Sequence, residues 1–305
     1  MGQGGIGELE DCANLIWNRS ARPFMHMFDK YGPVVRLQGV FGGNIVFVSH
    51  PEHIETVFQH EGRYPVRSSL DSIDKYRSQY RNTQMLGPSI MSEPEWEVLR
   101  KTIEASFGNI AFQYHGKLEN TADEMITRIR LIKNRQEEVP NSFSEDIYKW
   151  ALENTALVLL GKRLGLLDSS ENHQLSNWVK TALAYRSCII AKYIRMVQNN
   201  LDNKKEDILT NKNAEYSSML EMLLLKGELQ PNDILTVLLD TFLIGVNAIS
   251  HAFSFLLYHL AKNPWVQRKA FNEIIKVMPE KDSTLSYSSL LHLPYTQACL
   301  QESLR

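Results

Sequence analysis

Leu293-Pro294-Tyr295-Thr-Gln-Ala-Cys-Leu-Gln-Glu302-Ser-Leu-Arg305 ends the chain and predicts an apolar helix with an acid and a base in its last turn. A glutamate and an arginine three residues apart lie on one helix face and can pair. An exposed pair contributes about a few tenths of a kcal/mol, whereas a buried pair must satisfy both charges. E-x-x-R is common by itself, so the rest of the chain decides its meaning.

Residues 233–262 predict a long helix that is apolar nearly all round and closes at Asn263-Pro264. Such a helix belongs in the core of a large protein or in a membrane. Residues 241–261 lack formal charge and are long enough to span a bilayer. Their amide, hydroxyl and imidazole side chains weigh against a lipid environment, so we interpret the segment as a central core helix.

Trp96 and Arg100 are four residues apart in a segment with helical pattern, so they share a helix face. An indole N–H and a guanidinium together suit a pair of carboxylates. The alternative is a cation–π pair on a surface helix.

The N-terminal part predicts a small β structure followed by a loop. Residues 34–37 and 45–48 are β-branched runs separated by glycines, which favours a hairpin. A helix is expected from Pro51 to about His60, with Ser49 as a cap candidate. Residues 62–92 are polar and aperiodic, which predicts a long loop of the kind that is often functional.

From Glu93 onward the pattern is almost wholly helical, and residues 199–213 look like an exposed connection between helices. We therefore expect one mainly α domain over residues 1–305. Within it, residues 1–92 hold the small β-sheet and the loop, and residues 93–305 form the helical body.

Composition limits the class of protein. The chain has 305 residues, of which 43% are hydrophobic and 22% charged, as in a globular protein. The net charge of −2 gives no electrostatic case for nucleic acid. Three dispersed cysteines argue against a disulfide framework, and without C-x-x-C or H-E-x-x-H no metal site is predicted.

These segments, in this order, resemble the cytochrome P-450 family of haem-thiolate monooxygenases over essentially the entire chain. The resemblance implies haem b as cofactor, with Trp96 and Arg100 on the C helix holding a propionate. It makes Glu302 and Arg305 the structural ion pair of the K helix, and Gly245 a residue of the I helix at which oxygen could approach the backbone.

The I-helix segment departs from the family pattern. Where the family has an acid and an alcohol that relay protons, this chain has Asn247 and Ala248, with Ser250 nearby. An amide does not titrate and alanine has no hydroxyl, so water or Ser250 would have to substitute. Leu243 and Val246 are the expected substrate contacts.

The resemblance also implies an iron-ligating cysteine in a loop after E-x-x-R. None of Cys12, Cys188 and Cys299 has the expected neighbours. We therefore expect a piece of the family's fold that is cut at the K helix, lacks its iron ligand and is inactive by itself.

Tyr64-Pro65-Val66-Arg67 resembles the mitochondrial clan. That resemblance implies a position at the inner membrane on the matrix side and a 2Fe–2S ferredoxin as electron donor. A targeting segment is expected to be absent or to lie upstream, because the N-terminus has no apolar or Arg-rich leader.

Three functions remain open. The first is a monooxygenase that inserts one oxygen atom from O2 into an apolar, steroid-like substrate. The second is a haem-thiolate isomerase or lyase that acts on a pre-oxidised substrate, which Asn247 and Ala248 would suit. The third is a non-catalytic, all-α binding protein derived from the enzyme fold.

Overall fold

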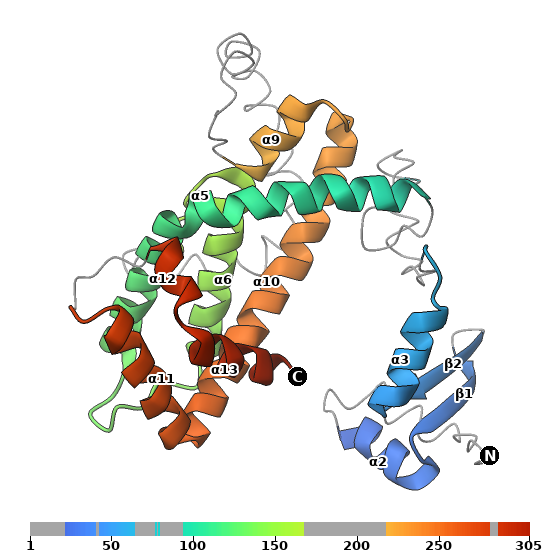
Figure 1. Ribbon diagram of the computed structural model, residues 1–305, viewed down its shortest axis with the longest axis horizontal. Helices are drawn as coiled ribbons and strands as arrows, with labels where there is room; N and C mark the ends of the chain where they lie inside the picture. The colour runs from blue at the N-terminus through green and yellow to red at the C-terminus, as the bar shows by residue number, and fades with distance from the viewer. Residues whose placement is uncertain are drawn as a thin grey trace. The chain divides into compact units, whose positions relative to one another are not determined.

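The computed structural model describes residues 22–40, 43–64, 77, 79, 94–167, 218–280 and 286–305. Its mainly helical architecture with one small sheet confirms the predicted fold class (Figure 1). The elements, in chain order, are α2 Arg22–Tyr31, β1 Val34–Val40, β2 Gly43–Val48, α3 Pro51–His60, α5 Pro94–Ile132, α6 Phe143–Leu160, α9 Met219–Lys226, α10 Pro231–Lys262, α11 Pro264–Val277, α12 Tyr287–Leu291 and α13 Pro294–Leu304.

The chain divides into two compact units, residues 1–66 and 67–305. The expectation of a single domain stays a prediction. The predicted connection at residues 199–213 lies outside the described residues, as does the loop at 62–92 apart from residues 62–64, 77 and 79.

The first unit holds the hairpin. β1 and β2 pair antiparallel, with Val34 opposite Val48. Alternate side chains of a strand point to the same face, and Val35 and Leu37 pack with Met27 of α2 into a small core. α3 begins at Pro51 as predicted, but its N-cap residue is His50, which forms no side-chain cap, and the Ser49 hydroxyl donates to the Pro33 carbonyl at 3.4 Å.

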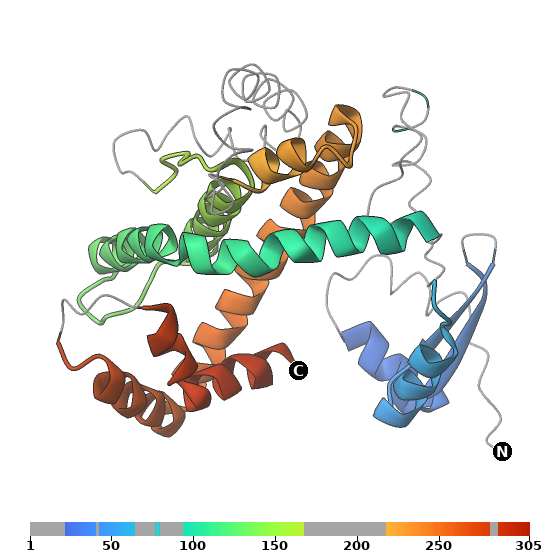
Figure 2. The same ribbon diagram turned by 45° about the horizontal axis from the view of Figure 1, so that its top comes forward.

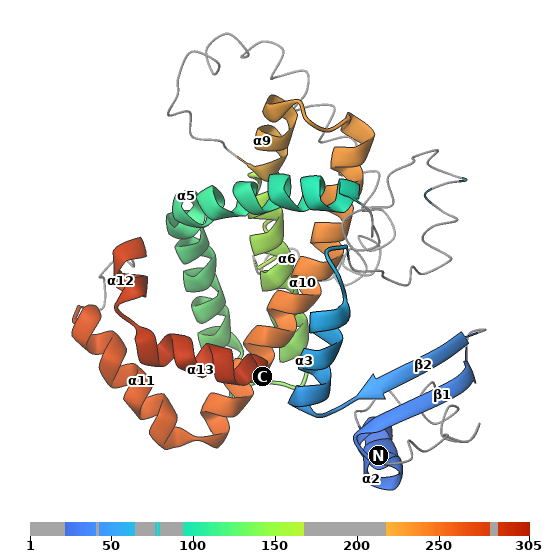
Figure 3. The same ribbon diagram turned by 45° about the vertical axis from the view of Figure 1, so that its right-hand side comes forward.

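The second unit is built around α10. This helix crosses α5, lies alongside α6 and meets α9 near its N-terminal end (Figures 2 and 3). α11 and α13 pack against its C-terminal part. The largest fully buried side chains of this core are Tyr114, Leu99, Leu159, Met219, Leu220, Met222, Leu223, Ile234 and Leu238.

Local chemistry sets where these helices begin and end. The Ser218 hydroxyl caps α9 by accepting from the Glu221 N–H at 3.0 Å. Gly227, with φ of +66°, ends α9 in the left-handed conformation that glycine adopts without strain. Pro231 then occupies the first turn of α10, where its missing N–H costs nothing.

By length and composition α10 would suit a membrane span, but the core helix of a globular protein passes the same test. Ile234, Val237 and Leu238 are completely buried against the neighbouring helices. This packing supports the core-helix interpretation.

Candidate functional site

α10 buries one side and exposes the other along much of its length. Ile244 and Phe255 are 53% and 51% exposed, and Ala248 and His251 are exposed between them. Steps of three, four and seven residues place these side chains on one helix face. We call this set the open face of α10; it is mostly apolar, with one imidazole.

The two predicted substrate contacts lie on different sides of α10. Leu243 is exposed at the border of the open face. Val246 is only 1% exposed and belongs to the hydrophobic core. In this structure Leu243 can contact a ligand on the open face, whereas Val246 packs into the core on another side of α10.

Asn247 is held by hydrogen bonds at both ends of its amide. Its Nδ2 donates to the Leu243 carbonyl at 2.9 Å, and its Oδ1 accepts from the Tyr148 hydroxyl of α6 at 3.3 Å. Ser250 is buried, and its hydroxyl donates to the Asn247 carbonyl at 3.0 Å. Of the predicted relay positions, only Ala248 lies on the open face, and the alanine side chain has no exchangeable proton.

Gly245 faces α6. A Cβ built at Gly245 would lie 3.6 Å from Cγ2 of Thr155 and 3.8 Å from its Oγ1. The space left by the missing side chain therefore adjoins α6 and not the open face.

Trp96 and Arg100 share a face of α5, as predicted. The Arg100 guanidinium lies 5.0 Å from the centroid of the buried Trp96 ring. Its Nε donates to Glu104 at 2.6 Å, and the Arg100 side chain is 54% exposed. The pair is thus a cation–π contact with a surface counter-ion, and an incoming carboxylate would compete with Glu104 for the guanidinium.

Glu302 and Arg305 pair at the end of α13, with 2.7 Å between Oε1 and Nη2. Both side chains are exposed, by 66% and 80% respectively. In this structure the pair is therefore an exposed i,i+3 ion pair and not a buried one.

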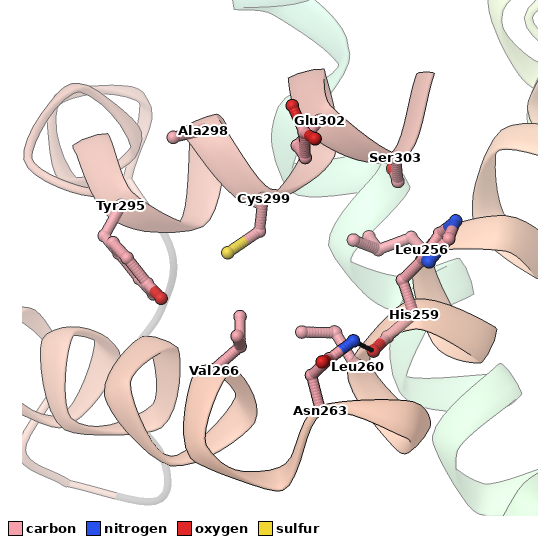
Figure 4. Close-up of a pocket in the computed structure, with 10 residues that line it drawn as sticks. All are labelled: Leu256, His259, Leu260, Asn263, Val266, Tyr295, Ala298, Cys299, Glu302 and Ser303. Atoms are coloured by element: carbon pink, nitrogen blue, oxygen red, sulfur yellow. Dashed lines mark hydrogen bonds between the residues drawn. The ribbon is translucent and has the colours of Figure 1, made fainter. Parts of the chain in front are cut away.

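A cavity of about 400 Å³ lies between α10, α11 and α13 (Figure 4). Cys299 and Tyr295 of α13 point into it, toward Val266 of α11 and Leu260 of α10. Its full lining is Leu256, His259, Leu260, Asn263, Val266, Tyr295, Ala298, Cys299, Glu302 and Ser303. The cavity does not include residues 243–250, so it is separate from the predicted relay segment.

A haem group needs an apolar surface, cations for its carboxylates and a ligand for its iron. The open face of α10 offers the first and Arg100 the second. Burial raises the pKa of the Cys299 thiol, and the negative Glu273 raises it further, while Lys269 acts in the opposite direction. Because iron binds the thiolate, Cys299 is a poor ligand, so the described residues include an apolar surface and a cation of the kinds that suit a porphyrin but do not supply the thiolate.

Sequence reasoning missed Tyr148, Glu104 and His251. Tyr148 is 99 residues from Asn247, and no local pattern pairs them. Glu104 follows Arg100 by one helical turn and was available to an i,i+4 search. His251 was counted only as a polar residue within the helix, although it shares a face with Ala248.

Comparison with known proteins agrees with this architecture. The cytochrome P-450 family model matches residues 7–188 and 179–305. Probable cytochrome P-450 49a1 of Drosophila melanogaster is 29% identical, over 90% of this chain and 53% of that protein. Cytochrome P-450 CYP12A2 of Musca domestica is 27% identical, over 90% of this chain and 58% of that protein.

Probable cytochrome P-450 12a5, mitochondrial, of Drosophila melanogaster is 28% identical, over 90% of this chain and 58% of that protein. A crystal structure of the cytochrome P-450 CYP102L1 superposes with a TM-score of 0.70 at 18% identity, covering 99% of this chain and 70% of that one. The chain thus spans a little over half the length of these curated relatives. With a family model that covers nearly all of its residues, the chain belongs to the cytochrome P-450 family.

Proposed function

We propose that this chain forms part of a haem-dependent monooxygenase that inserts one oxygen atom from O2 into a small apolar substrate. The open face of α10 carries the proposal, because a core helix would otherwise expose Ile244 and Phe255 to water at a cost. Family membership supports it, since the family's members are typically monooxygenases.

Arg100 and Trp96 would hold the haem carboxylates. The guanidinium already stacks on the indole, so a propionate would need only to replace Glu104 as its partner. Ile244 and Ala248 would pack against the porphyrin and keep water from it, and Leu243 would contact the substrate. Bound haem would supply the activation of oxygen, with its iron ligand coming from outside the described residues.

His251 is the residue on the open face that can exchange a proton. Its Nδ1 lies 2.7 Å from the Asn247 carbonyl oxygen. A carbonyl only accepts, so Nδ1 carries the hydrogen and Nε2 of the neutral ring is left as an acceptor. Asn247 and Ala248 lack this capacity, which makes His251 the better candidate for holding a proton near a ligand.

Haem titration of the chain tests the proposal. We expect ferric protoporphyrin IX to bind, with its absorbance band shifted, and Arg100→Gln to weaken binding by at least about tenfold through loss of a charge-assisted hydrogen bond. Arg135→Gln, which removes an exposed arginine after α5, is the control and should bind as the unaltered chain does. Equal weakening in both variants would contradict the assignment of Arg100.

A haem-thiolate isomerase or lyase is the second candidate, and the bonded amide of Asn247 beside Ala248 favours it. Such an enzyme receives its oxygen within the substrate and needs no proton relay to O2. In a protein of the relatives' full length, Asn247→Asp with Ala248→Thr should raise the share of electrons that reach hydroxylated product. If the unaltered protein already couples electrons to hydroxylation tightly, this candidate fails.

The names of several relatives include the word mitochondrial. We therefore propose a position on the matrix side of the inner membrane and a 2Fe–2S ferredoxin as electron donor. Protease protection in fractionated mitochondria tests the location. Reduction of the haem-loaded, full-length protein by a 2Fe–2S ferredoxin, compared with a flavoprotein reductase, tests the donor.

A further inference from the structure

The first turn of α13 has no cap of its own. Leu293 at the N-cap position makes no side-chain hydrogen bond, and Pro294 has no N–H to offer. The N–H groups of Tyr295 and Thr296 therefore need acceptors from elsewhere, because the first amides of a helix have no partner within it.

Glu273 of α11 supplies both acceptors. Its Oε1 accepts from the Tyr295 N–H at 2.8 Å, and its Oε2 accepts from the Thr296 N–H at 2.8 Å and from the Thr296 hydroxyl at 2.7 Å. A carboxylate at the positive end of a helix gains from the helix dipole as well as from these bonds. One side chain thus replaces the missing cap across a gap of 22 residues in sequence.

We propose that Glu273 is the positioning residue of α13: it fixes where the helix begins on α11, and so fixes the wall that Tyr295 and Cys299 present to the cavity. The same anchor sets the direction in which α13 carries Glu302 and Arg305. The inference concerns the packing of α11 and α13 and does not depend on the proposed monooxygenase function.

The charges around Glu273 are consistent with this role. Lys269 of α11 lies over the Tyr295 ring, with Nζ 4.2 Å from the centroid. Partial burial pushes the pKa of Glu273 upward, but the bonds from Tyr295 and Thr296, with Lys269 nearby, outweigh it and leave the pKa below its ordinary value. The other titratable groups on α13 and across the cavity are Tyr295, Cys299, Glu302 and His259.

The sign of the pH dependence follows from that lowered pKa. A carboxylate with a lowered pKa in the folded state stabilises the fold fully above its ordinary pKa, and this stabilisation is lost as pH falls through the folded value. Acid should therefore loosen the start of α13 in the unaltered protein. A variant without the carboxylate should be loose already at neutral pH.

The thiol of Cys299 reports on this contact. In a background with Cys12→Ser and Cys188→Ser, the Cys299 thiolate attacks the disulfide of 4,4′-dithiodipyridine and releases 4-thiopyridone, whose absorbance gives the rate; the reagent stays reactive in acid because protonation of its ring nitrogens activates the leaving group. Glu273 also raises the pKa of Cys299 directly, so rates are compared per thiolate, with the thiolate fraction of each variant measured by its absorbance. On that basis Glu273→Gln should speed the reaction at pH 7 at least about tenfold, because charge-assisted bonds are lost. It should also abolish the further rise in acid. Glu280→Gln, an exposed carboxylate just beyond α11, is the matched control and should change neither.

Thr296→Val removes a single bond to Glu273 and keeps the test decisive if Glu273→Gln fails to fold. It should speed the thiol reaction by about threefold. Amide hydrogen exchange at Tyr295 and Thr296 should accelerate in both variants, while exchange within α6 stays unchanged. Thiol reactivity that is the same in Glu273→Gln and Glu280→Gln at every pH would overturn the proposal, as would unchanged reactivity in Thr296→Val.

Discussion

Gly245 lies in the interior of α10, close to Thr155 of α6. A methyl group there would meet Thr155 at 3.6 Å, an ordinary van der Waals distance. Alanine is favoured over glycine within helices by about 1 kcal/mol. We expect Gly245→Ala to raise the free energy of unfolding in urea by up to about that amount, and to leave haem affinity unchanged because the methyl points toward α6.

Gly116→Ala is the matched control for this prediction, since Gly116 also lies within a helix and has open space where its Cβ would be. It should gain stability from helix propensity alone. A loss of stability in Gly245→Ala together with a gain in Gly116→Ala would show that α6 approaches α10 more closely than this packing allows.

The hydroxyl of Tyr148 connects α6 to α10 through its hydrogen bond to Asn247. Tyr148→Phe removes the bond to Asn247 Oδ1 and should cost about 1 kcal/mol of stability, measured by thermal or urea unfolding. Asn247→Ala in the Tyr148→Phe background should then cost less than Asn247→Ala alone. Additive costs would contradict a direct bond between the two side chains.

Glu153 of α6 holds the turn that follows its own helix. It is fully buried and accepts from the backbone N–H groups of Leu164, Gly165 and Leu166, and from Arg163 Nε at 2.7 Å. Glu153→Ala leaves these donors without an acceptor and should cost about 3 kcal/mol or more in urea unfolding. Glu124→Gln touches only the exposed side of Arg163 and should cost less than about 1 kcal/mol. Similar costs for both variants would contradict the central place of Glu153.

Local patterns could predict the elements but not their partners. The proline at Pro51 and the apolar run of α10 set helices that the structure confirms within one or two residues. Ser49 was expected to cap α3, but the N-cap position is His50, and the pairing of β2 with β1 places the Ser49 hydroxyl beside the Pro33 carbonyl. The spacing of Trp96 and Arg100 predicted their contact correctly, whereas their use by haem stays a prediction.

In the candidate site, too, the sequence predicts the helix but not which residues its neighbours cover. Periodicity places Ala248 on a face with Ile244 and His251, but only packing decides which face is covered. Val246 illustrates the point, since nothing local distinguishes it from Leu243, and the hydrophobic core covers Val246 but not Leu243. The bond between Glu273 and α13 is likewise invisible in sequence, because it depends on how two helices meet.

At the scale of the whole molecule, the two units should differ in stability. The first has a core of Met27, Val35 and Leu37, whereas the second buries the larger cluster around α6, α9 and α10. Small cores bury too little apolar surface to resist local opening. We expect amides of β1 and β2 to exchange hydrogen faster than those of α6 and α10, as mass spectrometry of peptic fragments would show. Equal protection in both units would contradict the expected difference in stability.

Arg77 and Asp240 form an ion pair that is almost completely buried, with Arg77 Nη1 also enclosed and without a hydrogen-bond partner. Losing one member would strand its opposite charge in the interior, at about 3–5 kcal/mol, whereas exchanging both for apolar residues of similar size can be neutral. The two residues are 163 positions apart along the chain. Because of this cost, we expect their substitutions to be correlated among homologous proteins, which should keep both residues or replace both.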